Sequence, residues 1–485
     1  EGRDGALWFG TNRGVSRYDG KGFISFTSKD GLAYDQVRAI YCDDEGTLWF
    51  GTYRGGVSRY DDHSFISFTT RDGLPHNRVL SIAEDDEGNL WIATSGGLAR
   101  YDGRRFAVFT SQNGLPSDSV QCIYKSRDGS LWFGTNGGGV SRYDGNGFIT
   151  LDESDGLAYN RVNVIARGEG DSLWIGMRTR GVSQLDTEKL TFRTLTCEDG
   201  LLDTHVKAIY SDPSGVVWFG TNEGGVFRYD GRGFVNLTVE DGLLSNTVNA
   251  IVRGPDGALW FGTTEGISRY DGHRFTHITR ESGLADNFVS VIYVDREGRV
   301  WVGTDSGGVS VYDGSTWVSL DTRDGLISNT IYAIYEDKRG NVWIGTNNGL
   351  TRYRPGGLPP AVRITSVRTG RGFADLRGIP SVTAGDRVTI EYRSIDLSTQ
   401  PDKRMYRRRI YRLGSSEKPP FSRPSKGAKF EWVPRKAGIY VFEVQAVDRD
   451  LNYSPPAHIT LKVVPPWYLN GWIAVSYTHL TLPTN

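Results

Sequence analysis

The chain has 485 residues, of which 38% are hydrophobic and 23% charged, enough to bury a large core and to form more than one domain. Its 56 Lys and Arg residues against 57 Asp and Glu residues give a net charge of -1, which excludes recognition of nucleic acid or anionic membrane by overall charge. Three cysteines are too few for a disulfide framework or a zinc site, and no run of about 20 apolar residues could span a bilayer.

A repeated motif, Leu or Val followed by Trp, then an apolar residue, Gly and Thr, runs through most of the chain. It begins as LWFGT at 7–11, and its tryptophans recur every 41 to 44 residues. They are Trp8, Trp49, Trp91, Trp132, Trp174, Trp218, Trp260, Trp301 and Trp343.

Each unit contains four strand-sized stretches, for example VRAIY (37–41), TLWFGT (47–52), GVSRYD (56–61) and FISFT (65–69). Glycine- and Asp-rich turns join them. A helical repeat of this length would need a 3.6-residue period and few glycines, whereas 62 residues here are glycine. The pattern therefore predicts an all-β chain whose units are four-stranded blades of a β-propeller.

The unit count leaves two ring sizes open. The first unit lacks its VRAIY-type strand, and the ninth stops after GLTRY (349–353). A ring that closes with an early strand has either eight blades, starting with the strand at 23–27, or seven, starting with the strand at 65–69. Residues 1–355 are assigned to the propeller repeats, with 1–62 as the remnant of a preceding propeller if the ring has seven blades.

A different domain follows a linker at 356–361. The stretches VRITSV (362–367), RVTIEYRSID (387–396), MYRRRIYRL (405–413) and GIYVFEVQAVD (438–448) predict a small Ig-like β-sandwich over 362–464. Residues 465–475 are interpreted as the start of a juxtamembrane segment. Residues 476–485 differ in composition from everything before them and are interpreted as a non-native tail.

The units, with their LWFGT…GGVSRYDG…F…FT…DGL spacing, resemble the two-component regulator propeller repeat. Residues 362–467, with Tyr392, Tyr406, Tyr411 and a terminal PPW, resemble the Y_Y_Y domain that follows such propellers. Two features depart from the family: nine motifs stand where two full rings would have fourteen, and GSSEKPPF (414–421) replaces a Trp-containing turn.

The resemblance implies the periplasmic sensor region of a histidine kinase, often a hybrid one, in an inner-membrane protein. It also implies a homodimer in the full-length protein, contact with the membrane only through a missing C-terminal helix, and an oligosaccharide or other small polar molecule as ligand.

No motif of catalysis or phosphate binding occurs, so we expect no enzymatic activity, no catalytic residue, no metal and no cofactor. The repeated DDEG and DREG loops (43–46, 85–88, 295–298) are interpreted as Asp-initiated turns rather than calcium loops. The polar residue three positions after each DGL is interpreted as a structural Asx turn. The basic run at 403–412 is interpreted as an exposed strand face, since no second basic patch supports nucleic-acid binding.

Candidate ligand-binding residues come from loops that differ between blades. In a four-stranded meander, the loop that leads into each blade and the loop between its second and third strands lie on one face. Aromatic and charged side chains there suit a polar, planar or sugar-like ligand. The candidates are Tyr34, Arg54, His76, Arg78, Tyr159, Arg161, Arg178, Arg180, His205, Glu223, Glu265 and Phe288. A ligand-sensing module is the leading hypothesis; a protein-binding scaffold and a propeller lyase or hydrolase are the alternatives.

Overall fold

The computed structural model describes residues 6–18, 22–42, 48–53, 56–60, 65–145, 147–357, 359–369, 372–374, 381–396, 398–415 and 417–466. It divides into two compact units, one made of residues 1–61 with 357–485 and the other of residues 62–356. Each unit is described by itself below. Among the described residues, no helix is both long and apolar enough to cross a membrane.

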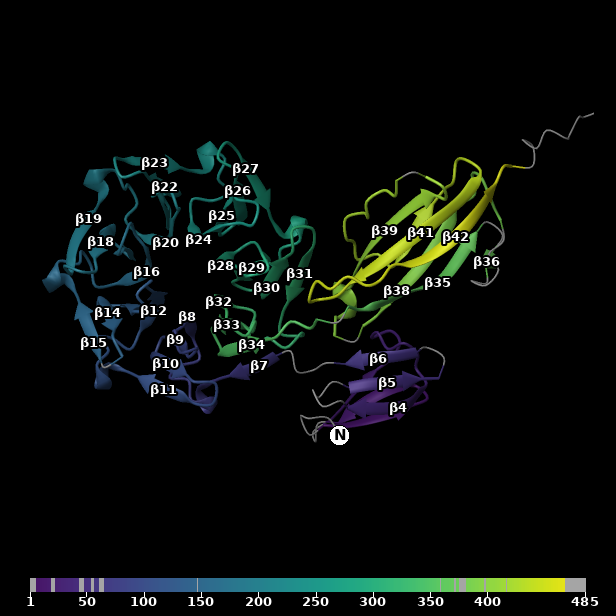
Figure 1. The fold of residues 1–485 in the computed structure, drawn as a ribbon, viewed down its shortest axis with the longest axis horizontal. Helices are drawn as coiled ribbons and strands as arrows, with labels where there is room; N and C mark the ends of the chain where they lie inside the picture. Colours follow the sequence, from purple (N-terminus) through teal and green to yellow (C-terminus); the bar gives the residue numbers. More distant parts are fainter. Residues whose placement is uncertain are drawn as a thin grey trace, which may run out of the picture. The chain divides into compact units, whose positions relative to one another are not determined.

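The second unit is a ring of four-stranded antiparallel sheets (Figure 1). In chain order its first three blades are β8 (Val79–Glu84), β9 (Leu90–Thr94), β10 (Gly97–Tyr101) and β11 (Phe106–Phe109); β12 (Val120–Lys125), β13 (Leu131–Thr135), β14 (Val140–Tyr143) and β15 (Phe148–Leu151); β16 (Val162–Arg167), β17 (Ser172–Met177), β18 (Val182–Asp186) and β19 (Thr191–Leu195). The next three are β20 (Val206–Ser211), β21 (Val217–Thr221), β22 (Val226–Tyr229) and β23 (Phe234–Leu237); β24 (Val248–Arg253), β25 (Leu259–Thr263), β26 (Gly266–Tyr270) and β27 (Phe275–Ile278); β28 (Val289–Val294), β29 (Val300–Thr304), β30 (Val309–Tyr312) and β31 (Trp317–Leu320).

An early strand closes the ring. The last blade consists of β32 (Ile331–Glu336), β33 (Val342–Thr346), β34 (Leu350–Tyr353) and β7 (Phe65–Phe68), so its outer strand precedes the first blade in sequence. The register pairs Leu350 with Phe68 and Tyr353 with Phe65. Of the two closures that the sequence leaves open, the structure therefore has the seven-bladed one.

The first strand of every blade faces the axis of the ring, because these strands contact one another in order from β8 round to β32 and back to β8. Short 3₁₀ helices lie between successive blades: η1 (Thr70–Asp72), η2 (Ser111–Asn113), η3 (Glu153–Asp155), η4 (Cys197–Asp199), η5 (Val239–Asp241) and η6 (Arg280–Ser282).

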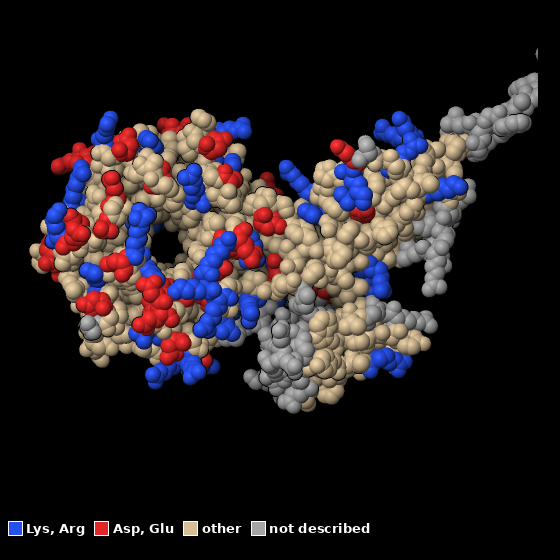
Figure 2. Space-filling view, in the orientation of Figure 1, with Lys and Arg blue, Asp and Glu red and all other residues tan. Residues whose placement is uncertain are grey.

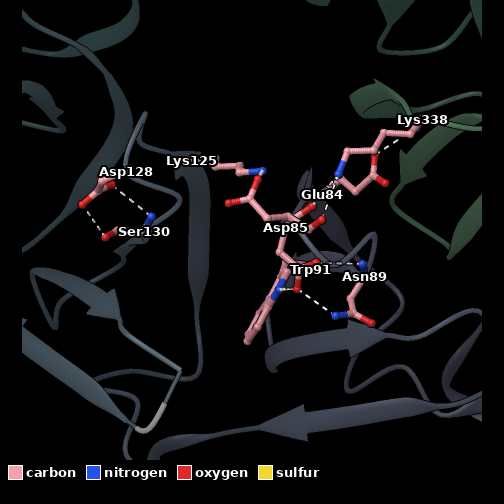
Figure 3. A network of polar contacts seen from close by, with 9 residues as sticks. Glu84, Asp85, Asn89, Trp91, Lys125, Asp128, Ser130 and Lys338 are labelled. Carbon is pink, nitrogen blue, oxygen red and sulfur yellow. Dashed lines mark hydrogen bonds and ion pairs between the residues drawn. The ribbon is translucent and has the colours of Figure 1, made fainter.

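The repeated tryptophan is buried in every blade of the ring, and in four of them its indole N–H donates to the turn before its strand. The indole N–H of Trp91 donates to Asp85 over 2.9 Å, and that of Trp301 donates to Asp295 over 2.7 Å. Figure 3 shows the first of these contacts, with Asn89 on the same carboxylate. The carboxylates of the DDEG-type loops at 85–88 and 295–298 thus hold a turn and an indole, as the turn interpretation predicts. The loop at 43–46 lies outside the described residues.

The last blade is also tied to the first on the side of these turns (Figure 3). The backbone N–H of Lys338 donates to the buried carboxylate of Glu84 over 3.0 Å, and its ammonium group donates to the carbonyls of Asp85 and Asp86. Lys125 of the second blade pairs with Asp86 over 2.6 Å. Polar contacts therefore join three consecutive blades where the chain closes on itself.

The glycine of the Trp-x-Gly-Thr motif is where adjacent blades come closest. A Cβ on Gly345 would lie 2.6 Å from Cγ1 of Val79, and one on Gly303 would lie 2.6 Å from Cγ2 of Ile331. Both contacts are shorter than van der Waals distance. The glycine recurs because the inner strand of the next blade occupies the space that a side chain would need.

The first unit contains two three-stranded sheets and a sandwich. The sheets are β1 (Leu7–Thr11), β2 (Gly14–Tyr18) and β3 (Phe23–Phe26), and β4 (Val37–Cys42), β5 (Leu48–Thr52) and β6 (Gly56–Tyr60). One sandwich sheet has the order β36 (Gly372–Ala374), β35 (Ala361–Thr369), β38 (Val388–Ile395), β40 (Lys429–Trp432). The other has the order β37 (Val382–Thr383), β42 (Ala457–Val464), β41 (Gly438–Val447), β39 (Met405–Arg412), and η7 (Pro401–Lys403) precedes β39.

Side chains from both sheets form the sandwich core. Tyr392 on β38 lies edge-on to Tyr406 on β39, with ring centroids 5.0 Å apart, and Phe442 on β41 packs against both sheets. The hydroxyl of Tyr406 accepts a hydrogen bond from the backbone N–H of Ser394. The tyrosines that mark this domain in the sequence thus join its two layers.

The basic run on β39 is packed, and the expectation of an exposed strand face is wrong for much of it. Arg407 lies 4.2 Å from the ring centroid of Tyr453, and Arg409 lies 4.2 Å from that of Phe421. Arg409 also pairs with the buried carboxylate of Glu443 over 2.6 Å. The guanidinium groups hold the segment around Phe421 against an edge strand.

Candidate functional site

Two sets of loops form one face of the ring, here called the DGL face: the DGL loops that lead into the blades and the loops between second and third strands. Within a blade, the second-to-third-strand loop donates a backbone hydrogen bond to the DGL loop, and it makes a similar bond to the DGL loop of the following blade. The bonds within blades include Ser95 to Arg78, Arg178 to Arg161, Asn222 to His205 and Asp305 to Phe288. The bonds between blades include Gly181 to Thr204, Gly225 to Asn246 and Gly308 to Asn329. The meander argument therefore places these loops correctly.

The polar residue that recurs after DGL has a structural role, as interpreted from the sequence. The hydrogen bond that it makes differs from the one expected. Its side-chain oxygen accepts the backbone N–H of the residue seven positions earlier, across the 3₁₀ turn, instead of closing an Asx turn. The pairs in the ring are Asn77 with Thr70, Asp118 with Ser111, Asn160 with Glu153, Asn246 with Val239, Asn287 with Arg280 and Asn329 with Thr322. The β20 blade departs from this pattern, with Thr204 at the position.

In the β20 blade an aspartate holds the loops instead. One carboxylate oxygen of Asp203 accepts the backbone N–H of His205 over 2.9 Å. The other accepts the backbone N–H groups of Glu223 and Gly224 over 2.8 and 2.9 Å. These bonds lower the pKa of Asp203 although its partial burial opposes them. Asp286, at the same position of the β28 blade, instead accepts the hydroxyl of Ser306 in the equivalent loop.

Arg178, His205 and Glu223, three of the predicted residues, lie together with Asp203 and Lys207. Burial is the main cause that lowers the pKa of His205; the positive charges of Lys207 and Arg178 lower it further, and Asp203 and Glu223 oppose them. Burial also lowers the pKa of Lys207, again against Asp203 and Glu223. The neutral form of the imidazole is therefore favoured, and the positive charge of the cluster resides on Arg178 and Lys207.

A cavity of about 530 Å³ opens beside this cluster. Its lining combines carboxylates, amides and a hydroxyl with an apolar floor: Leu202, Asp203, Asn222, Glu223, Gly224, Phe227, Asn236, Thr238 and Asn246. The side-chain oxygen of Asn236 is buried and has no hydrogen-bond partner in the part of the chain that the structure describes. This lining suits a ligand with several hydroxyl groups.

The preceding blade carries Arg178 and three more of the predicted residues. The guanidinium of Arg180 lies 5.4 Å from the ring centroid of Tyr159 and pairs with Glu153 over 3.5 Å. Arg161 and Arg178 are exposed. Arg180 has φ 68°, a left-handed conformation that is uncommon for a residue other than glycine and is found mostly where the surrounding structure enforces it.

The remaining candidates are dispersed. His76 accepts the backbone N–H of Arg78 over 2.9 Å, and Arg78 stacks over Tyr332 at 5.0 Å. Glu265 and Phe288 are exposed on separate blades. Tyr34 belongs to the other compact unit, and Arg54 lies outside the described residues. The structure therefore does not bring these residues to the cluster around His205.

Figure 2 shows an opening at the centre of the propeller, and the inner strands that face the axis share a variable position that the sequence analysis missed. Every inner strand has a register shift around its second residue, and such a bulge re-aims the side chain. These residues are Leu80, Gln121, Asn163, Lys207, Asn249, Ser290 and Tyr332. A signal was available, because this position varies between units while the Val or Ile before it does not.

The sequence model of the two-component regulator propeller family matches residues 31–54, 73–96, 114–137, 200–223, 242–265, 283–306 and 325–348. The chain carries two-component regulator propeller repeats. No curated protein matches the sequence significantly. One complete blade of the ring is not matched by the family model, and it is the blade that contains β16 and β17. This blade carries Tyr159, Arg161, Arg178 and Arg180. The unit that departs most from the repeat is thus the one richest in candidate residues.

Solved structures with the same fold include the extracellular domain of the hybrid two-component system BT3049 from B. thetaiotaomicron. It has a TM-score of 0.59 and 24% identity, over 96% of this chain and 67% of that one. Two structures of the extracellular domain of BT4673 from the same organism, described once as a one-component and once as a hybrid two-component system, have TM-scores of 0.55 and 0.53 at 20% identity. They match over 96% of this regulator propeller chain and over 69% and 68% of their own.

Proposed function

We propose that this chain is the extracytoplasmic, ligand-sensing region of a two-component system whose output is a histidine kinase. Its ring binds an oligosaccharide or another small polar molecule on the DGL face, over the blades β16–β19 and β20–β23. The signal passes through the sandwich to a following transmembrane helix in a homodimer of the full-length inner-membrane protein.

The observation that carries this proposal is local. The strands of the seven blades repeat closely, whereas the loops of two adjacent blades on the DGL face do not. In those loops Arg180 adopts a left-handed backbone, Thr204 stands at the recurring Asn or Asp position, and Asp203 binds the loop at 222–224. Backbone strain and departures from a repeat concentrate where function requires them. The fold shared with extracellular domains of two-component systems supports the sensor role.

Contacts within the first unit support coupling between a DGL loop and the sandwich. Arg393 and Arg404 of the sandwich donate hydrogen bonds to backbone carbonyls of the DGL loop that leads into β4. Arg393 reaches Ser28 and Ala33, and Arg404 reaches Lys29 and Asp30. A displacement of such a loop would reach the sandwich directly, because the guanidinium groups hold its backbone.

The test is a calorimetric binding screen of the whole chain against a panel of neutral and acidic oligosaccharides. We expect at least one to bind, and Arg178→Ala to weaken that binding about tenfold or more, as loss of a charged hydrogen bond does. Arg105→Ala is the matched control, because Arg105 is 89% exposed and lies in a turn on the opposite face. Absence of binding across the panel, or equal loss in both variants, would refute the proposal.

A further inference from the structure

Three basic side chains on or next to the DGL face make no direct ion pair with a carboxylate of the described residues. They are Arg161 and Arg178 of the β16 blade and Lys207 of the β20 blade, and none of them makes an ion pair with any described residue. Arg180, also of the β16 blade, pairs with Glu153. Lys207 donates one hydrogen bond, to the side chain of Asn249 over 3.1 Å. Two of the three ammonium hydrogens therefore remain for another acceptor.

These side chains are close to one another. The backbone N–H of Arg178 donates to the carbonyl of Arg161 over 3.0 Å, so the two residues are neighbours across one blade. The positive charges of Lys207 and Arg178 both lower the pKa of His205, so both residues lie near its imidazole. Lys207 lies at the bulge of β20, and Asn163 and Asn249 hold the corresponding positions on the inner strands of the neighbouring blades.

The acidic residues nearby do not neutralise this group. Asp203 is engaged by three backbone N–H groups, and Glu223 is held by the side chain of Asn222 over 3.4 Å. The three basic side chains and these two carboxylates together carry a net charge of +1. A half-buried ammonium that makes no direct ion pair is costly to maintain, because burial strips water from the charge.

We propose that Arg161, Arg178 and Lys207 form a subsite for the carboxylate group of a sugar acid, whose hydroxyl groups occupy the cavity of about 530 Å³ that Asp203 and Glu223 line. The subsite rests on the proposed function and specifies its ligand. Guanidinium groups bind carboxylates in a planar, bidentate way, and the ammonium adds a point charge. The amides of Asn222 and Asn246 and the hydroxyl of Thr238 line the cavity beside it.

The experiment compares glucuronate, glucose and acetate by calorimetry on the whole chain. Glucuronate should bind at least about tenfold more tightly than either of the others, because glucose lacks the carboxylate and acetate lacks the hydroxyl groups. Equal affinity for glucuronate and glucose would overturn the proposal. Equal affinity for glucuronate and acetate would contradict the assignment to a sugar acid.

Substitutions test whether Lys207 and Arg178 cause the preference for glucuronate. Lys207→Met and Arg178→Met should each remove the preference for glucuronate, and Lys207→Arg should retain part of it. The matched control is Lys189→Met, because Lys189 is 75% exposed and pairs with Asp186 at a turn on the opposite face. Arg178 is exposed, so its variant keeps the test valid if a change on the inner strand disturbs folding.

Failure of this inference differs from failure of the sensor proposal. A neutral oligosaccharide that binds the wild-type chain and Lys207→Met equally well, with no binding of glucuronate, would overturn the carboxylate subsite and leave the sensor proposal intact. Absence of binding by every sugar, neutral or acidic, would overturn both.

Discussion

Closure of the ring by β7 can be tested with Phe68→Ala. Phe68 is half-buried; its ring stacks on Trp343 at 5.9 Å and contacts Tyr101 at 5.4 Å and Phe106 at 5.7 Å. Truncating a fully buried phenylalanine costs about 3–5 kcal/mol, so a half-buried one should cost about 2–3 kcal/mol. For a unit of this size that corresponds to a fall in Tm of about 4–6 °C.

Hydrogen exchange gives the local readout. The amides of Leu350–Tyr353 on β34 should exchange about 30- to 100-fold faster in Phe68→Ala, because the strand that protects them is less firmly held. Phe23→Ala is the control, since Phe23 lies on an outer strand of the other unit and is 67% exposed. Unchanged exchange of β34 in Phe68→Ala would refute the closure by β7.

Three further predictions concern the turns and the sandwich. Asp295→Ala should lower the free energy of unfolding by about 2–4 kcal/mol, because the buried indole N–H of Trp301 loses its acceptor; denaturant unfolding followed by tryptophan fluorescence measures this, and a loss below about 0.5 kcal/mol would contradict it. Asn160→Ala should free the backbone N–H of Glu153 and speed hydrogen exchange at 153–157 about fivefold, with no change expected in other blades. Burial, helped by Asp450 and Asp396, raises the pKa of Asp448 to about 7 from 3.8, so the folded sandwich holds this proton more tightly than the unfolded chain does. Stability should therefore fall by up to about 4 kcal/mol as pH rises from about 4 to about 7, and Asp448→Asn should abolish that fall; an identical pH profile in the variant would show that another group is responsible.

The blades could be predicted from the sequence because their determinants are local and repeated. A tryptophan every 41 to 44 residues and turn residues at fixed offsets specify a four-stranded unit. The ring size could not be predicted, because two outer-strand sequences, at 23–27 and 65–69, were equally suited to pair with β34. That pairing joins residues almost 300 positions apart, and strand composition does not encode which partner is used.

The candidate site was predicted in part. Variation between DGL loops indicated Arg178, His205 and Glu223, which the structure brings together. Lys207 was missed because it lies within a strand, and the register shift at its position depends on pairing with the next strand. Asp203 was missed because its role depends on backbone N–H groups of a loop about 20 residues away.

The most direct test of the binding face is hydrogen-exchange mass spectrometry of the whole chain with and without a sugar that binds it. The account predicts protection of the DGL-face segments at 158–162, 178–182 and 203–207, together with 222–225. Protection confined to the turns on the opposite face, at 126–130 and 168–171, would contradict it.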